Sequence, residues 1–278
     1  MANQEPRLFL HDHPVSSYAQ KVRIALRHKG IPFDHAVPAH LGSGQRNGAL
    51  LAANPRQEVP ALVDGDVSVF DSTIILEYLE DKYPEPALLP PRRDPAARAR
   101  ARMIEDVTDC QYEAVNWAYG EVVWWGRGEE EGVAETVKEQ VGLHTRDLQA
   151  WLAEKLGAGP FFGGEKLGWA DCAVAPIVHR SVAWGMGPAE GSALQLWHAR
   201  VSEVPSVKET FAEFDAAARA MEDPKSGLKG VFKSGGRKRE YRDHRLEFML
   251  KAGGNSIVQS GLRDQNIRFS WPRPDPPK

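Results

Sequence analysis

The stretch from Leu8 to Leu26 constrains the fold more than any other part of the chain. A short apolar run, Leu8–Leu10, is followed by a polar break and then by a helical pattern from Val15 onward. This order predicts a strand, a loop and a helix, with the hydroxyls of Ser16 and Ser17 at the helix N-terminus. Unpaired backbone N–H groups and the helix dipole favour an anion there. A hydroxyl donor at such a place stabilises a thiolate. Because no cysteine stands there, we expect a bound thiol cofactor.

The composition is that of an ordinary globular protein and excludes several classes. Hydrophobic residues make up 42% of the 278 residues and charged residues 26%. A net charge of −3 gives no field that would attract nucleic acid or an anionic membrane, so we expect neither as a partner. Two cysteines in a chain of this length exclude a disulfide scaffold and predict a reducing, cytoplasmic location. No signal-peptide pattern is seen, and no apolar run approaches the roughly 20 residues that span a bilayer.

Residues 7–85 are predicted to form a small α/β domain. The helical pattern between the first two apolar runs predicts a parallel strand pair with a right-handed crossover. Asp64-Gly65-Asp66 between two β-rich runs predicts a hairpin. The expected strands are 7–10, 31–37, 60–63 and 67–70, and the expected helices are 18–29 and 71–83.

A proline-rich break over residues 86–94 is interpreted as a linker to an all-helical domain over residues 95–222. Asp94 and Pro95 are typical of a helix N-cap and first helical residue. Further helices are expected over 133–156 and from 168 to 184. The helix that begins at Pro95 is expected to bury a stripe formed by Met103, Val107, Cys110, Ala114 and Trp117. Cys110 and Cys172 are accordingly interpreted as small buried hydrophobic residues.

The composition changes at residue 223, so 223–278 is interpreted as a partly helical C-terminal extension. Residues 225–239 are rich in Gly, Ser and Lys, which predicts a mobile connector. Short helices are expected over 240–251 and 257–262. The proline-rich end, 271–278, is expected to be disordered.

Four segments carry a resemblance to the cytosolic glutathione transferases. Ser16–Arg23 is similar to the signature of serine-type members such as the zeta and tau classes, and its middle part also resembles the omega class. Asn54–Leu62 resembles the family's Asn-Pro-x-Gly-x-Val-Pro-Ala-Leu segment, and Phe70–Ile75 its acidic-Ser-x-x-Ile segment. Gly164–Asp171 resembles the segment that opens the central helix of the second domain. The resemblance covers residues 7–220 and implies a thioredoxin-like domain followed by an all-α domain.

The resemblance implies that Ser16 is the catalytic residue. Its hydroxyl would donate a hydrogen bond to the sulfur of glutathione and lower the thiol pKa, which for a free thiol is about 8.5. Ser17 is the rival for this role, and Tyr18 is a weaker one. The alternative is that Ser16 is only the N-cap of its helix, a role that is compatible with catalysis.

The second and third segments imply the contacts that hold glutathione. Val59-Pro60 would be a cis peptide that exposes the Val59 backbone to the cysteinyl unit, as an added strand would. Ser72 and its neighbouring N–H groups would hold the γ-glutamyl carboxylate, and Asp71 would pair with the γ-glutamyl ammonium. The alternatives are an ordinary proline at a strand start and a plain helix N-cap.

This sequence departs from the family pattern near the cofactor. Gln57 replaces the usual Gly, and Glu58 brings a negative charge close to an anionic cofactor. The glycyl carboxylate would be met by Arg46, with Gln45 and His40 as further candidates. A solvated loop arginine is the alternative for Arg46.

The electrophile is expected to be hydrophobic and aromatic. Its pocket would be lined by Trp117, Tyr119, Trp124 and Tyr18. Core packing or a dimer contact is the alternative for the aromatic cluster. The implied reactions are conjugation, ether cleavage, dehalogenation and isomerisation, and the extension suggests a specialised substrate such as a secondary metabolite or an aryl ether.

Two hypotheses follow from the sequence. The first is a homodimeric glutathione transferase that activates glutathione as a thiolate. The second is a binding or regulatory protein that kept the fold without turnover, which Gln57 and Glu58 favour. The histidines form no metal-ligand pattern, so we expect no metal.

Overall fold

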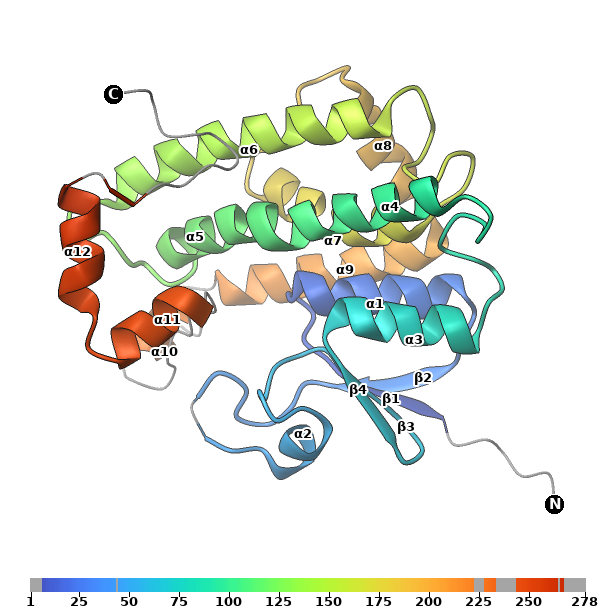
Figure 1. Ribbon diagram of the computed structural model, residues 1–278, viewed down its shortest axis with the longest axis horizontal. Coiled ribbons are helices and arrows are strands. Elements are labelled where there is room, and N and C mark those ends of the chain that lie inside the picture. The colour runs from blue at the N-terminus through green and yellow to red at the C-terminus, as the bar shows by residue number, and fades with distance from the viewer. Residues whose placement is uncertain (1–6, 44, 223–227, 234–243, 265, 268–278) are drawn as a thin grey trace.

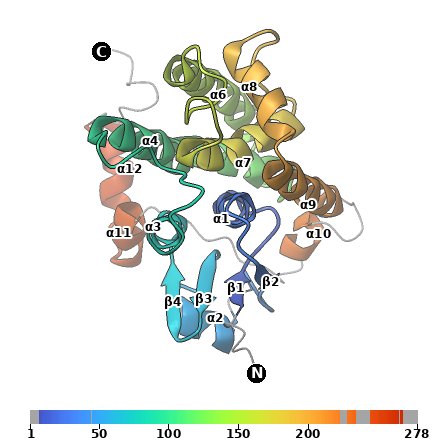
Figure 2. The same ribbon diagram turned by 90° about the vertical axis from the view of Figure 1, so that its right-hand side faces the viewer.

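The computed structural model describes residues 7–43, 45–222, 228–233, 244–264 and 266–267. A four-stranded sheet lies at one end of the molecule, and a bundle of helices lies above it (Figures 1 and 2). The sheet region contains β1 (Leu8–His11), α1 (Ser17–His28), β2 (Phe33–Ala36), α2 (Gly48–Ala53), β3 (Ala61–Asp64), β4 (Val67–Phe70) and α3 (Ser72–Lys82).

The sheet has the strand order β2-β1-β3-β4, so β4 forms an edge. β1 and β2 are parallel, and β3 is antiparallel to both β1 and β4. The parallel pair and the hairpin at Asp64-Gly65-Asp66 are therefore confirmed. Figure 2 shows α1 and α3 between the sheet and the helical bundle, while α2 packs on the other face of the sheet.

The helices after residue 94 form the bundle, and none of the described residues from 95 onward forms a strand. These helices are α4 (Pro95–Val107), α5 (Glu113–Val123), α6 (Ala134–Leu156), α7 (Trp169–Ala183), α8 (Ala193–Ser202), α9 (Pro205–Met221), α10 (Leu228–Lys233), α11 (His244–Lys251) and α12 (Asn255–Arg263). A π-helical turn, Thr108–Tyr112, separates α4 from α5. Among the described residues, no helix has the length and apolar character needed to cross a membrane.

Helix α1 joins the sheet to the bundle. Its apolar face, with Val22, Ala25 and Leu26, is completely buried, and Gly30 ends it with a φ of 66°. Lys21 is also buried, and its Nζ lies 2.6 Å from Glu105 Oε1 and 2.5 Å from Asp109 Oδ2. An ion pair across this boundary ties the two parts together, because removing either partner leaves a buried charge unpaired.

The predicted inward stripe of the first bundle helix is wrong. Met103, Cys110 and Ala114 are exposed, and Cys110 is therefore not a buried hydrophobic residue, whereas Cys172 is buried as expected. The helix buries Ile104, Thr108, Tyr112 and Asn116 instead, together with Glu105. Two causes account for the error. The π-helical turn changes the helical phase, and part of the inward face is polar, which hydrophobic periodicity does not detect.

The extension also differs in part from expectation. The predicted connector, 225–239, contains the helix α10, while its remaining residues lie outside the described part of the chain. The two predicted helices correspond to α11 and α12, although 240–243 are not described. The predicted disorder of 271–278 also falls outside the described residues.

Asp109 gives a test of the buried charges through pH. Burial, opposed by Lys21 and reinforced by Glu105, raises the pKa of Asp109 to about 6. A carboxyl with a raised folded-state pKa holds its proton more tightly in the folded protein, so its contribution to stability falls as pH rises from about 4 through 6. We expect Asp109→Asn to become progressively more stable relative to the unmodified protein over this range.

The measurement is urea unfolding of both proteins at a series of pH values. Only the difference between their free energies of unfolding is used, because carboxyl groups that do not interact with Asp109 contribute equally to both. If the difference between the two free energies of unfolding stays constant between pH 4 and 7, the pKa of Asp109 is not raised in the folded protein.

Candidate functional site

Ser16 is the N-cap of α1, and its Oγ accepts a hydrogen bond of 3.3 Å from the Ala19 N–H. The side chain is half-buried, and within the described residues its hydroxyl proton has no acceptor. Ser17 differs, because it is buried and its Oγ donates to Glu113 Oε2 at 2.9 Å. The hydroxyl of Tyr18 donates to the Asp109 carbonyl at 2.8 Å. Of the three candidate hydroxyls, that of Ser16 is therefore the one available to a ligand.

A buried arginine from the bundle holds the loop that carries Ser16. Arg180 on α7 donates from Nη1 to Glu113 Oε1 at 2.7 Å and from Nη2 to the Val15 carbonyl. Glu113 thus accepts from Ser17 with one oxygen and from Arg180 with the other. The chain of contacts runs from α7 through α5 to the first turn of α1, and it fixes the backbone on both sides of Ser16.

The Val59-Pro60 peptide bond is cis, as the resemblance implied. Val59 is only partly buried, and its backbone N–H and C=O have no hydrogen-bond partner among the described residues. Pro60 leads directly into β3, so these two groups stand just before the first residue of that strand. They are suited to pairing with an extended peptide.

Asp71 and Ser72 open α3. Asp71 is the N-cap, and its Oδ1 accepts from the Thr73 N–H at 3.0 Å, while Oδ2 faces Arg56 Nη2 at 3.8 Å. The Nε of Arg56 lies 3.7 Å from Glu58 Oε2. Arg56 therefore offsets the negative charge of Glu58 that set this sequence apart from the family pattern. Ser72 is buried, and no hydrogen bond of its hydroxyl is found within the described residues.

Backbone strain gathers in the same loops. Within the described residues, the non-glycine residues with positive φ are His40 (61°), Gln57 (53°) and Asp71 (75°). Gln57 occupies the position where the family has Gly, and its side chain accepts from the Asn47 N–H at 3.1 Å. Strained residues of this kind persist mainly at ligand-binding positions.

The three candidates for the glycyl carboxylate lie on the loop before α2. Arg46, Gln45 and His40 are all exposed. Arg46 forms no ion pair with any described residue. Its proposed contact remains a prediction.

The aromatic residues divide into two groups. Trp124 and Tyr119 gather around Trp184, with ring centroids 4.9 Å and 5.1 Å away respectively. Trp124 also belongs to a small buried cluster with Trp125, Phe214 and Ala218. Trp117 and Tyr18 are not part of this cluster, and a common pocket for the four residues remains a prediction.

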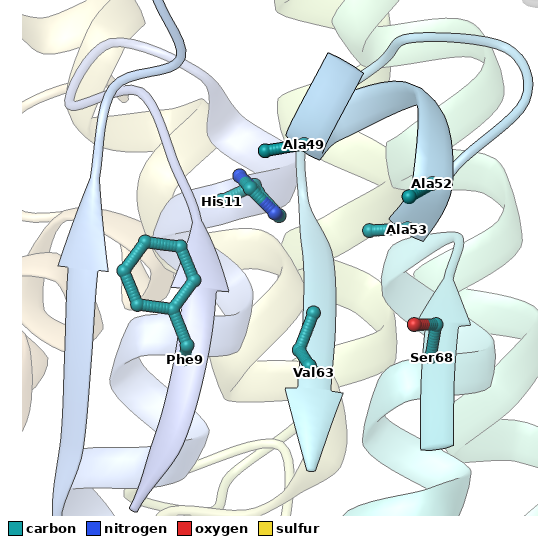
Figure 3. A pocket seen from close by; sticks show the side chains of 7 residues that line it. All are labelled: Phe9, His11, Ala49, Ala52, Ala53, Val63 and Ser68. Carbon is teal, nitrogen blue, oxygen red and sulfur yellow. The ribbon is translucent and has the colours of Figure 1, made fainter. Parts of the chain in front are cut away.

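Two surface hollows occur in the sheet domain. One of about 350 Å³ lies between α2 and the outer face of the sheet and is mostly apolar (Figure 3). It is lined by Phe9, His11, Ala49, Ala52, Ala53, Val63 and Ser68. The other, of about 800 Å³, runs beside β4 and includes Arg56, Phe70, Asp71 and Ile74. No metal-binding group is found among the described residues.

Known proteins match this chain over most of its length. The N-terminal domain of the glutathione S-transferases matches residues 10–87, and their C-terminal domain matches residues 146–200. Glutathione S-transferase Z2 of Arabidopsis thaliana is 32% identical over 63% of this chain and 77% of its own length. The maleylacetoacetate isomerase of Pseudomonas aeruginosa is 32% identical over 65% of this chain and 83% of its own length.

The chain belongs to the glutathione S-transferase family. A rice glutathione S-transferase solved in complex with glutathione aligns with a TM-score of 0.62 at 29% identity, over 78% of this chain and 98% of that one. The predicted fold class, an α/β domain followed by a helical domain, is confirmed. Sequence reasoning did not find Arg56, Glu113 or Arg180. The short spacing of Arg56 and Glu58 was a usable signal, whereas nothing local marked the other two.

The Glu113–Arg180 pair can be tested by a mutant cycle. We expect Arg180→Met to cost about 3–5 kcal/mol of unfolding free energy, because it leaves the buried Glu113 carboxylate without its ion-pair partner. Adding Glu113→Gln to Arg180→Met should recover much of this loss, since the unpaired charge is then removed. The measurement is chemical denaturation of the two single variants and the double variant. Strictly additive losses would contradict a coupled pair.

Proposed function

We propose that this glutathione S-transferase binds glutathione and activates it as a thiolate through Ser16. The hydroxyl of Ser16 donates to the sulfur, and the first turn of α1 adds the positive end of its dipole. Both interactions favour the ionised thiol and lower its pKa. The thiolate then attacks an electrophile held against the helical bundle.

One observation carries this proposal. Two adjacent hydroxyls stand at the start of α1, and only one of them is available. Ser17 is committed to Glu113 at 2.9 Å, while the Ser16 proton has no acceptor within the described residues. The hydrogen bond to Glu113 thus holds Ser17 in place, and the Ser16 hydroxyl stays available to a ligand.

The rest of the cofactor site follows from the loops around it. The free backbone groups of Val59 pair with the cysteinyl unit. Ser72 and the start of α3 hold the γ-glutamyl carboxylate, and Asp71 pairs with its ammonium. Arg56 neutralises Glu58, so the negative charge at position 58 does not prevent binding. For this reason we favour the hypothesis of an active enzyme over that of a binding protein without turnover. Arg46, with Gln45 and His40, meets the glycyl carboxylate.

The electrophile is hydrophobic and aromatic, and Tyr119, Trp124, Trp117 and Tyr18 contribute to its site. Conjugation, ether cleavage and dehalogenation are all consistent with a thiolate nucleophile. The similarity to the Pseudomonas aeruginosa protein named maleylacetoacetate isomerase adds glutathione-dependent isomerisation as a candidate reaction. Both cysteines are unpaired, which fits a cytoplasmic protein.

The two serines provide a matched test of the proposal. We expect the unmodified protein to bind glutathione in calorimetry and to lower the pKa of the bound thiol, measured from thiolate absorbance as pH is raised. Ser16→Ala should return that pKa toward the free value of about 8.5 with little change in affinity. Ser17→Ala should lower stability and leave the thiol pKa closer to that of the unmodified protein.

The opposite pattern, with the low thiol pKa retained in Ser16→Ala, would assign the role to another group. Absence of glutathione binding at millimolar concentration would reject the enzyme and favour the binding or regulatory protein.

We also propose that two copies of the chain associate through the face formed by β4, α3 and α4. β4 is a sheet edge, and Ile74 on α3 and Met103 on α4 are 54% and 61% exposed. Large apolar side chains gathered on one face are typical of protein interfaces. The hollow beside β4 would receive side chains of the second copy.

The association is tested with Ile74→Glu, which places a charge at the centre of this face. We expect sedimentation to show dimers of the unmodified protein and monomers of the variant. Leu196→Glu is the control, because Leu196 is 52% exposed on α8, away from this face (Figure 2). Monomers of the unmodified protein, or equal effects of the two substitutions, would reject this interface.

A further inference from the structure

Helix α10 lies on the aromatic cluster at the end of α5. Leu228 and Phe232 pack against the cluster of Trp124, Trp125, Phe214 and Ala218. The Phe232 ring meets that of Trp125 edge-on, with centroids 5.9 Å apart. A part of the extension that has no counterpart in the motifs of the family thus covers the residues expected to hold the electrophile.

The body of the protein is shaped to receive this helix. Lys229 Nζ lies 2.9 Å from both carboxylate oxygens of Glu129. The Arg127 guanidinium lies over the Phe232 ring, 5.5 Å from its centroid. Gly126 has a φ of 62°, and a Cβ at this position would come within 2.5 Å of the Lys229 side chain. An ion pair, a cation–π contact and a glycine therefore all accommodate α10.

The same cluster reaches the catalytic loop. Val15, which directly precedes Ser16, packs against it, as does Trp184. Arg180 connects the two regions, because its Nη2 bonds to the Val15 carbonyl and its guanidinium lies 5.9 Å from the ring centroids of Trp124 and Trp184. Leu228 and Phe232 are partly buried, so part of each side chain faces outward from the cluster.

The described residues of α11 and α12 lie outside the aromatic cluster that α10 covers. None of the residues of α11 or α12 belongs to a buried hydrophobic cluster within the described chain, and Phe248 on α11 is 71% exposed. Figure 1 shows both helices at the left end of the molecule, and Figure 2 shows α11 and α10 on opposite sides of the view. Phe232 and Phe248 thus form a matched pair, because both are phenylalanines of the extension and only Phe232 packs on the aromatic cluster.

We propose that α10 forms one wall of the electrophile site and that Phe232 sets the size of the aromatic electrophile that the enzyme accepts. This inference rests on the proposed role of Ser16 and adds the surface against which the electrophile lies. The wall is apolar and aromatic, from Phe232, Leu228, Trp124 and Val15. It therefore suits a flat aromatic ligand that stacks on rings. Shortening Phe232 enlarges the site toward solvent and leaves the thiol chemistry unchanged.

The test compares Phe232→Ala, Phe248→Ala and the unmodified protein. The substrates are activated aryl chlorides with one, two and three fused rings. We expect Phe232→Ala to raise kcat/KM for the three-ring compound relative to the one-ring compound by about tenfold, within the range that a single pocket contact provides. The KM for glutathione and the pKa of the bound thiol should not change. Phe248→Ala should behave as the unmodified protein.

Lys229→Glu is a second variant that keeps the Phe232 side chain but repels Glu129 and so displaces α10. We expect it to shift the size preference in the same direction. Equal changes for all ring sizes in Phe232→Ala, or the same shift in Phe248→Ala, would overturn the proposal.

A binding measurement separates this inference from the proposed reaction. Quenching of tryptophan fluorescence by unreactive one-ring and three-ring hydrocarbons reports on the wall without turnover. We expect Phe232→Ala to change the affinity ratio of the two ligands even if glutathione is not activated. If the affinity ratio is unchanged and the pKa of the bound thiol is still lowered, α10 is not a wall of the electrophile site, and the proposed role of Ser16 is unaffected.

Discussion

The carboxylate of Glu113 is the contact on which the geometry around Ser16 depends. Its two oxygens accept from Ser17 and from Arg180, and Arg180 in turn holds the Val15 carbonyl. The first turn of the helix in the sheet domain is thereby fixed from the helical bundle. A site built this way requires both domains to be docked, and the buried contacts of Lys21 with Glu105 and Asp109 supply a second tie. The orientation of Ser16 therefore depends on the docking of the helical bundle onto the sheet domain.

Local patterns predicted the sheet domain well. The helix from Ser17 follows from its apolar spacing and from Gly30, and the hairpin follows from Asp64-Gly65-Asp66, because each signal lies within the element that it specifies. The inward face of α4 could not be found in this way. Glu105 is buried because it meets Lys21, which is 84 residues away in the chain, and a π-helical turn changes the phase beyond Val107.

The site was predictable in outline and undecided in detail. The sequence placed Ser16 and Ser17 at one helix start and favoured Ser16, but Ser17 stayed a rival because its partner, Glu113, is 96 residues away in the chain. The charge of Glu58 suggested a weakened site, and the structure adds Arg56, whose guanidinium lies 3.7 Å from Glu58 and 3.8 Å from Asp71. The aromatic residues were recognised, but their cover by α10 depends on the extension, for which no motif was available.

A crystal structure of the protein with glutathione bound tests the central claim most directly. We expect the Ser16 Oγ to lie within hydrogen-bonding distance of the glutathione sulfur, while Ser17 remains bonded to Glu113. The cysteinyl backbone of glutathione should pair with Val59. A sulfur that instead approaches Ser17 or Tyr18, with the bond between Ser17 and Glu113 broken, would contradict the assignment of Ser16.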